Sequence, residues 1–487
     1  MIFGSHNNSK AFPEKKEFEK FLKDRIPFYN LYPTQSNWKD VKEDKNYIKE
    51  LENLYKSEII PSLYLHFPFC PKQCYFCHCY TVISKKEDHY RQITKSITDE
   101  LINLFNLIKK ITGKKKIKIN NIHFGGGTPT VIPMDLFSEI MQIFKSNLDE
   151  ETLQEIAIEV DPRNGMDEKK LLKYSELGIN RISIGVQDFD DNVQLAVNRI
   201  NSFEMINGLL TKKVRESFRS INFDFIYGLP KQTKESIKRT AEKIVELNPD
   251  RIHCLNLEHR PDVYKHQKAY KETDLPEMYN KMEMYQETTE FLESSGYERI
   301  GLHKFAKPTD LLSKYKKLNK LYRNPNGYSP GWTYNMLAVG PSSTGKIGDY
   351  YFQNIYSLDD YKSTVSKNKI PVIREKKWSI EDGIRHKVIM DLLSYEKIYP
   401  KKVAEQFNIN FEKYFHRELL NLNEFIEDGY LEFKKDIEEY TVTARGSHFI
   451  NNICHVFDSY SDLQYASHRE FKDGVKSFDR SRVLKEI

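Results

Sequence analysis

The sequence contains few cysteines, only six in 487 residues. Such a low number excludes a disulfide framework as the main source of stability in a chain of this size. Four of the six lie within ten positions, from Cys70 to Cys79, whereas Cys254 and Cys454 stand alone. Cys254 falls in an apolar run and is expected to be a core residue. The clustering of the other four indicates a site that binds a metal or a cofactor.

Long apolar runs are missing as well. No stretch is long enough to cross a bilayer, and the polar first thirty residues contain no apolar segment of signal-peptide length. We therefore expect a cytoplasmic protein without a membrane span.

Neither sign of charge is in large excess, because the chain has 75 Lys and Arg residues and 70 Asp and Glu residues. This balance does not indicate a nucleic-acid or membrane partner.

The composition, with 39% hydrophobic and 13% aromatic residues, is typical of a folded globular enzyme. A chain of 487 residues is too long for one ordinary compact domain, so we expect two or three units. The pattern along the chain predicts an N-terminal extension over residues 1–56, a β/α unit over residues 57–360 and a mainly helical unit over residues 361–487.

A repeat of short apolar run, turn and helical segment begins near residue 60. This alternation predicts an α/β fold with a parallel sheet, and seven such strands favour a full or partial (β/α) barrel. Polar motifs follow the strands, so the carboxyl ends of a barrel would collect them at one mouth. The predicted strands are SLYLHF, KIKINNIHF, EIAIEV, RISIGV, SINFDFIYGL, RIHCLNL and RIGLHKF.

The last unit combines helical segments with a hairpin in YLEFKKDIEEYTVTARG, an arrangement that resembles a winged helix. A winged helix raises DNA binding as a hypothesis. The helix that would enter a groove has no concentrated Arg/Lys stripe, which favours a structural cap and no nucleic-acid partner.

The cysteine motif places Cys70, Cys74 and Cys77 with gaps of three and two residues. A structural zinc site would usually need a second Cys or His pair, and none follows at a suitable distance. Three thiolates on one loop suit a [4Fe-4S] cluster, whose fourth iron stays open for S-adenosylmethionine (SAM). Reductive cleavage of SAM there would give a 5′-deoxyadenosyl radical. Three interpretations of Cys79 stay open: it replaces one of the three ligands, it contacts the ligands without binding iron, or it is a small buried residue.

The next predicted strand ends in Gly125-Gly126-Gly127-Thr128-Pro129. Glycines allow the backbone to approach a ligand, and consecutive N–H groups can bind a carboxylate, while Thr128 adds a hydroxyl. A tight strand-to-helix turn without a ligand would explain the run equally well in isolation. Directly after the cysteine motif, it favours SAM binding.

These motifs together resemble oxygen-independent coproporphyrinogen III oxidase and its relatives in the radical SAM superfamily. The likeness covers nearly the whole chain, including YNLYPT, LHFPFC, CYFC, HFGGGTPT, IEVDPR, SIGVQDFDDNVQLAVNR and FDFIYGLPKQT. The resemblance implies a partial (β/α) barrel with an N-terminal extension and a mainly helical C-terminal domain.

The resemblance also implies site residues. Tyr64 would contact SAM at the cluster, Gly126, Gly127 and Thr128 would surround its methionine part, and Glu159 would bind its ammonium group or ribose. A second SAM is implied as well, at sites that match Phe76, Gln187, Arg199 and Asp224. Asp188 and Asn198 lie in the same motifs, and capping of a turn explains them as well as a role at a SAM site does.

Departures from the family pattern lie further along the chain, on the side where the family binds substrate. A Tyr-Ala-His-Leu-Pro-like run becomes LEHRP at 257–261, an Asp-His-Phe-Ala run becomes HKFA at 303–306, and Asn-Phe-Gln-Gly-Tyr becomes NPNGY at 324–328. A hydrophobic residue that contacts SAM in a later strand of the family becomes Thr344. The substrate-pocket candidates are therefore Glu258, Arg260, His303, Lys304, Asn326 and Thr344.

Three functions follow as hypotheses. A rebuilt pocket slightly favours a relative that transfers a methyl or methylene group from a second SAM. The alternatives are the oxidase itself, for which Arg260 and Lys304 could bind propionates, and a cluster- or haem-binding protein without turnover. We expect a monomer that takes a small-molecule substrate and an electron donor such as flavodoxin or ferredoxin.

Overall fold

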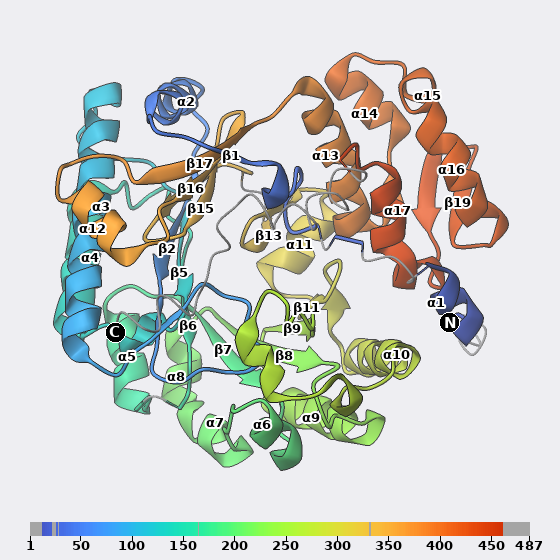
Figure 1. Ribbon diagram of the computed structural model, residues 1–487, viewed down its shortest axis with the longest axis horizontal. Helices are drawn as coiled ribbons and strands as arrows, with labels where there is room; N and C mark the ends of the chain where they lie inside the picture. Colours follow the sequence, from blue (N-terminus) through green and yellow to red (C-terminus); the bar gives the residue numbers. More distant parts are fainter. Residues whose placement is uncertain (1–11, 22–25, 28, 164, 331–332, 461–487) are drawn as a thin grey trace.

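The computed structural model describes residues 12–21, 26–27, 29–163, 165–330 and 333–460. Its centre is a thirteen-stranded sheet with the order β1-β17-β16-β15-β14-β2-β5-β6-β7-β8-β9-β11-β10. The sheet is open, since β1 and β10 are its two edges. The predicted α/β fold is confirmed, and of the two barrel forms the partial one is present (Figure 1).

Six neighbouring parallel strands form the part of the sheet that carries the motifs. Their interior positions are almost entirely buried, as expected for parallel strands covered on both faces. They are β2 (Ser62–Phe67), β5 (Asn121–Gly126), β6 (Glu155–Val160), β7 (Arg181–Gln187), β8 (Ser220–Tyr227) and β9 (Arg251–Asn256).

Helices cover the outer side of these strands (Figure 1). The predicted apolar face of helix α3 (Glu87–Thr112) is buried, with Ile97, Leu101 and Ile108 at 0% exposure. Burying each such side chain contributes roughly 1.5–3 kcal/mol. The helix ends at Gly113, whose φ of 68° suits glycine. The helices are α3 (Glu87–Thr112), α4 (Met134–Asn147), α5 (Glu168–Glu176), α6 (Asp191–Ala196), α7 (Phe203–Leu209), α8 (Lys212–Ser217), α9 (Lys234–Glu246) and α10 (Met278–Ser294).

One predicted strand is wrong. The segment RIGLHKF forms no seventh parallel strand but a short turn between β10 (Glu298–Arg299) and β11 (Lys304–Ala306). The chain reverses because Gly301 and His303 have φ of 120° and 64°, outside the range of a strand. Strand β11 therefore pairs with β9 in the antiparallel sense.

Beyond β2 the sheet continues with β14 (Met336–Val339), which is parallel to β2. The remaining strands there are antiparallel: β15 (Thr344–Ile347), β16 (Tyr350–Asn354), β17 (Val372–Lys377) and β1 (Lys39–Asp40). The N-terminal part of the chain thus completes one edge of the sheet.

The C-terminal unit has its own core, which includes Val388, Leu392 and Phe415. Phe18 of α1 (Lys15–Phe21) joins this core, and Figure 1 shows α1 beside the unit. Its order is that of a winged helix, but α16 carries Arg417 against three glutamates. The elements are α13 (Ile380–Tyr395), β18 (Lys397–Ile398), α14 (Pro400–Phe407), α15 (Phe411–Tyr414), α16 (His416–Glu427), β19 (Leu431–Lys434), β20 (Glu439–Val442) and α17 (Ile450–Val456).

In the described ranges, the helices lack the length and apolarity that crossing a bilayer requires.

Short elements connect these layers. The connecting elements are η2 (Gln35–Asn37), α2 (Lys45–Lys56), β3 (Phe69–Cys70), β4 (Val82–Ile83), η3 (Pro129–Val131), η4 (Lys265–Ala269), η5 (Glu272–Asp274), α11 (Leu311–Lys317), β12 (Leu321–Asn324), β13 (Gly327–Pro330), α12 (Leu358–Val365) and η6 (Gly446–Phe449).

Candidate functional site

The cysteine loop lies between β2 and α3, at the carboxyl ends of the parallel strands. Its base is fixed by pairing of β3 with β4, which places Cys70 opposite Ile83. Cys70, Cys74, Cys77 and Cys79 all line a cavity of about 160 Å³. The cavity is also lined by Phe76, Gly126, Gly127, Thr128, Glu159, Gln187, Arg199 and Asp224. The sequence therefore predicted residues that meet in space.

Different neighbours contact the three thiols. Cys70 Sγ lies 3.2 Å from Thr128 Oγ1, Arg163 Nη2 lies 3.3 Å from Cys74 Sγ, and the amide of Cys79 lies 3.4 Å from Cys77 Sγ. Burial raises the pKa of the Cys70 thiol to about 12. A thiol in this environment needs a bound cation to become a thiolate.

Across the residues that the structure describes, no three His, Cys, Asp or Glu side chains converge on one point. Thiolates that each bind a different iron of a cube need no such convergence. Cys79 is exposed, so its reading as a small buried residue is wrong.

The glycine run packs closely beneath the cysteine loop. A Cβ on Gly127 would lie 2.5 Å from the carbonyl oxygen of Phe69, and one on Gly125 would lie 2.8 Å from Glu159 Oε1 and 2.9 Å from Cε2 of Tyr64. Gly126 has φ of 114°, which side chains rarely adopt. Tyr64 thus lies beside the run without lining the cavity itself. The glycines allow the loop, Tyr64 and Glu159 to approach one another.

Two carboxylates face the cavity from different strands. Glu159 Oε1 lies 3.0 Å from His123 Nε2, and its Oε2 accepts from the amide of Gly126 at 3.2 Å. Asp224 accepts hydrogen bonds from Ser183 and Asn222, both at 2.8 Å. Burial opposes ionisation of Asp224, but His253 and the charge of Lys304 outweigh it and hold its pKa at about 2. A carboxylate that stays ionised suits ammonium or hydroxyl donors.

Gln187 and Arg199 both line the cavity, but they differ in whether their side-chain polar atoms have hydrogen-bond partners. Gln187 has a left-handed φ of 70°, and its buried Oε1 has no hydrogen-bond partner among the described residues. Such strain and such an orphaned acceptor are typical of a ligand site. The Arg199 guanidinium donates to Asp161 at 2.7 Å and to the carbonyl of Gly185 at 2.6 Å. Phe76 packs on the apolar cluster around Val193.

Sequence reasoning missed Asp161, Arg163 and His123. Asp161 is buried between Arg163 and Arg199, and although burial opposes it, these two cations lower its pKa. Arg163 in turn contacts Cys74. The signal was present, because both residues belong to the EVDPR motif at the end of a predicted strand, but no role was assigned to them.

Asp188 and Asn198, for which turn capping was an alternative, differ from each other. Asp188 accepts from the amide of Asp190 at 2.7 Å and from Thr240, and burial raises its pKa to about 6. Asn198, with φ of 55°, donates from Nδ2 to the carbonyl of Gln73 at 2.7 Å. Asp188 therefore stabilises its own turn, whereas Asn198 holds the cysteine loop.

The substrate-pocket candidates do not line the thiol cavity. Arg260 forms ion pairs with Glu258 at 3.5 Å and Asp262 at 3.2 Å. Asn326 is exposed at the turn between β12 and β13. Thr344, at the start of β15, lies 3.3 Å from Gln35 Nε2.

His303 and Lys304 lie closer to the barrel interior. His303 is buried, and its ring centroid lies 5.0 Å from that of Tyr285. Lys304 pairs with His253 in β9, which pairs with Asp224 in β8, so the three share one face of the sheet. Burial lowers the pKa of Lys304 to about 8, and within the described ranges its ammonium group forms no hydrogen bond.

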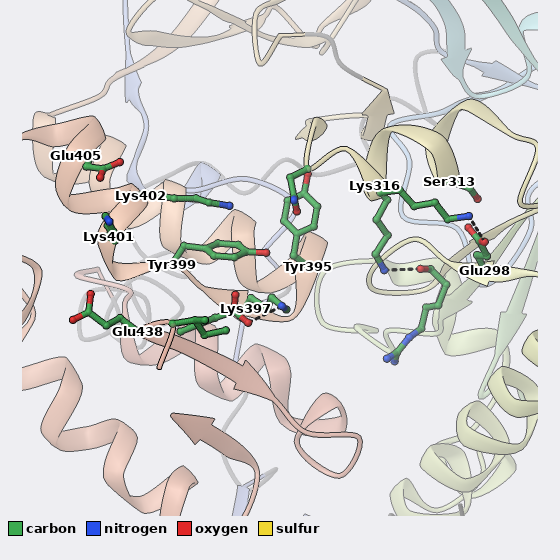
Figure 2. Close-up of a pocket in the computed structure, with 15 residues that line it drawn as sticks. Glu298, Ser313, Lys316, Tyr395, Lys397, Tyr399, Lys401, Lys402, Glu405 and Glu438 are labelled. Carbon is green, nitrogen blue, oxygen red and sulfur yellow. Dashed lines mark hydrogen bonds and ion pairs between the residues drawn. The ribbon is translucent and has the colours of Figure 1, made fainter. Parts of the chain in front are cut away.

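A second cavity of about 750 Å³ lies between the β10–α11 edge of the sheet and the C-terminal unit, and we call it the lysine cleft (Figure 2). Lys317 pairs with Glu298 and Lys397 with Glu439, both at 2.6 Å. Figure 2 shows Lys402 over the ring of Tyr399, at 3.8 Å from its centroid. No predicted site residue lines this cleft.

Comparison with known proteins identifies the class that this site defines. The family model described as the radical SAM superfamily matches residues 64–244, from β2 to α9. The chain is a radical SAM enzyme.

The relatives narrow this class. The chain is 34% identical over 434 residues to oxygen-independent coproporphyrinogen III oxidase of Escherichia coli strain K12, covering 89% of this chain and 93% of that protein. The Helicobacter pylori strain ATCC 700392 / 26695 protein of the same name is 34% identical over 460 residues, covering 91% and 96%. A solved Escherichia coli coproporphyrinogen III oxidase (HemN) gives a TM-score of 0.83 at 33% identity, covering 92% of this chain and all of that one. The chain belongs to the oxygen-independent coproporphyrinogen III oxidase family.

Membership implies a [4Fe-4S] cluster and SAM, and the residues present fit both. Cys70, Cys74 and Cys77 would hold three irons, while the orphaned oxygen of Gln187 and the ionised Asp224 offer acceptors to SAM. When bound, the cluster and SAM together supply a carbon-centred radical that can remove a hydrogen atom from an unactivated carbon.

Proposed function

We propose that this protein is an oxygen-independent coproporphyrinogen III oxidase of haem biosynthesis. The observation that carries the proposal is full-length agreement, since the TM-score of 0.83 extends over 92% of the chain and includes both flanking regions of the barrel. The relatives with this printed name span nearly the same length. The comparisons thus favour the oxidase over the methyl or methylene transfer that the altered motifs had slightly favoured.

The proposed reaction converts a propionate side chain into a vinyl group. A hydrogen atom passes from the carbon next to the ring to the 5′-deoxyadenosyl radical, and the carboxylate then departs as CO2 while one electron passes to an outside acceptor. This chain must bind the propionate so that this carbon faces the thiol cavity. A basic group inside the barrel is therefore needed.

Lys304 supplies that basic group in our proposal. Arg260, the other candidate, is already paired with Glu258 and Asp262. Lys304 lies in one row with His253 and Asp224, and Asp224 lines the thiol cavity. An ammonium without a hydrogen-bond partner in the described structure has its full capacity available for a carboxylate.

We also propose that Phe76, Gln187, Arg199 and Asp224 line a second SAM site. The unsatisfied Gln187 Oε1 and the low pKa of Asp224 support this proposal. Arg199 would contribute by holding Asp161 and the loop at Cys74 rather than as a free cation, because its donors are occupied.

Methyl or methylene transfer is the second candidate, favoured by the altered residues at 257–261 and 303–306. One anaerobic experiment separates the possibilities: the purified chain is loaded with iron and sulfide, reduced, and mixed with SAM and coproporphyrinogen III. The oxidase predicts 5′-deoxyadenosine and CO2 without S-adenosylhomocysteine. S-Adenosylhomocysteine with 5′-deoxyadenosine and no CO2 would reverse the order of the candidates, and no cleavage at all would indicate a binding protein. Reduced flavodoxin and ferredoxin, tested as donors, would identify the electron source.

A further inference from the structure

Residues 258–269 follow β9 and extend across the barrel mouth to the cysteine loop. Strands β9 and β2 stand at opposite ends of the six parallel strands, so the segment joins parts of the chain that the sheet keeps apart. The contact between His266 and Cys77 links positions 189 residues apart in sequence. We call residues 264–267 the strap.

Each strap residue that meets the loop has its own partner there. His266 Nε2 lies 2.6 Å from the carbonyl oxygen of Cys77, and it must donate because a carbonyl only accepts. Gln267 is fully buried and donates from Nε2 to the carbonyl of Phe76 at 3.3 Å. The ring of Tyr264 stacks on that of His78, with centroids 4.4 Å apart and planes inclined by 6°. Three consecutive loop residues are therefore held by the strap.

The first half of the loop is held by other elements. Val197 accepts from the amide of Tyr75 at 3.0 Å, and Asn198 donates to the carbonyl of Gln73 at 2.7 Å. Thr128 contacts Cys70, and Arg163 contacts Cys74. The second half of the loop thus has a support that is separate from these.

We propose that the strap sets the position of Cys77 as a cluster ligand, with His266 and Gln267 as its positioning residues. Their hydrogen bonds fix the carbonyl groups of Phe76 and Cys77, the peptide planes on both sides of the Cys77 Cα. Those planes set the direction of the Cα–Cβ bond from which the Cys77 sulfur extends. The inference rests on the cluster at the three cysteines, but not on which substrate the enzyme uses.

The strap also joins the loop to the altered substrate side. Gln267 Oε1 accepts from the amide of Arg260, and its Nε2 donates to the carbonyl of Glu258 at 3.1 Å. His78 Nε2 lies 2.7 Å from that same carbonyl. One buried side chain therefore connects the segment of Glu258 and Arg260 with the loop that carries Cys77.

The test uses the full chain with four substitutions: His266→Ala, Gln267→Ala, His266→Gln and Lys268→Ala. We expect the two strap alanines to lower iron and sulfide retained under a competing chelator about 10-fold, the usual effect of losing a residue that supports a metal ligand. His266→Gln should restore retention, since the amide nitrogen of Gln can replace the imidazole Nε2. Lys268 is exposed in the same 3-10 helix, so Lys268→Ala is the matched control.

Two further readouts do not depend on activity. The electron paramagnetic resonance spectrum of the reduced cluster should change in His266→Ala and not in Lys268→Ala. In the cluster-free chain, amide exchange should rise at residues 76–79 and stay unchanged at residues 73–75. Retention, spectrum and exchange equal to those of Lys268→Ala would overturn the proposal. A Cys77→Ala protein with a full cluster would instead refute the ligand assignment, which separates the two failures.

Discussion

The two cavities of this protein differ in how their polar groups are satisfied. The lysine cleft is the larger, at about 750 Å³ against about 160 Å³, and two of its lysines, Lys317 and Lys397, are paired with glutamates that also line it. The thiol cavity instead holds a cysteine with a pKa of about 12, an orphaned amide oxygen on Gln187 and an Asp224 with a pKa of about 2. Unsatisfied or perturbed groups indicate chemistry better than volume does.

The two cavities also differ in backbone geometry, because left-handed residues line the smaller one. Gln187 and Gly126 have φ of 70° and 114°, and both line it. Such backbone geometry costs about 1–3 kcal/mol for a residue with a side chain and persists where the surroundings enforce it. The same cavity contains the ion pairs of Asp161 with Arg163 and Arg199, which place cations against Cys74.

The largest effect is expected from the cysteines. Cys70→Ala, Cys74→Ala and Cys77→Ala should each remove the cluster and reduce activity by more than about 1,000-fold, because SAM cleavage depends on it. Iron content and the visible absorption spectrum measure the loss. Cys254→Ala is the control, since this thiol is buried in β9 away from the cavity and should cost only about 1 kcal/mol of stability. Full iron content in any of the three variants would contradict the assignment.

A smaller effect is expected at Glu159. Glu159→Gln keeps the shape but removes the charge that faces the cavity, so the Kd for SAM should rise about 10- to 100-fold, as for a lost hydrogen bond to a charged group. Equilibrium binding of SAM to the loaded enzyme measures this. Glu168→Gln on α5 is the control, because Glu168 accepts a hydrogen bond from Thr211 and does not line the cavity. Unchanged SAM binding would leave Glu159 with a structural role beside His123.

At Lys304 the prediction concerns pH. Its pKa, lowered to about 8 by burial, means that the ammonium is charged below pH 8 and neutral above it. The KM for coproporphyrinogen should therefore rise between about pH 8 and 9 in the wild type. Lys304→Arg should shift that rise above pH 11, because a guanidinium stays charged, and Lys304→Met should raise KM about 10-fold or more at pH 7.

The other ionisable groups around Lys304 do not account for a change in KM between pH 8 and 9. Asp224 and Glu155 both have a pKa of about 2, the neighbouring Glu155 and Asp310 raise the pKa of Arg251 above its usual value, and burial lowers the pKa of His253. None of them titrates between pH 8 and 9. An identical KM-against-pH profile in wild type and Lys304→Arg would contradict the role of Lys304.

Much of this could be predicted from sequence because it depends on local pattern. Strand β2 and helix α3 follow from apolar spacing, and the thiol cavity follows from motifs that end successive parallel strands. The reversal at Gly301 and His303 was missed, since a short apolar run does not reveal its pairing direction. Arg163 and His266 were missed because their partners, Cys74 and Cys77, are distant in sequence. Long-range pairs are set by packing, which no local pattern contains.

The smallest effect is expected in the lysine cleft. Lys401 and Lys402 are exposed at the start of α14, so a Lys401→Ala/Lys402→Ala variant should change stability by no more than about 0.5 kcal/mol per site. Cluster content and turnover with dithionite as reductant should stay within about twofold of the wild type. The variant should also match the wild type with reduced flavodoxin. A KM for flavodoxin raised tenfold, with dithionite turnover unchanged, would contradict the comparison and make the cleft a docking surface for an acidic electron donor.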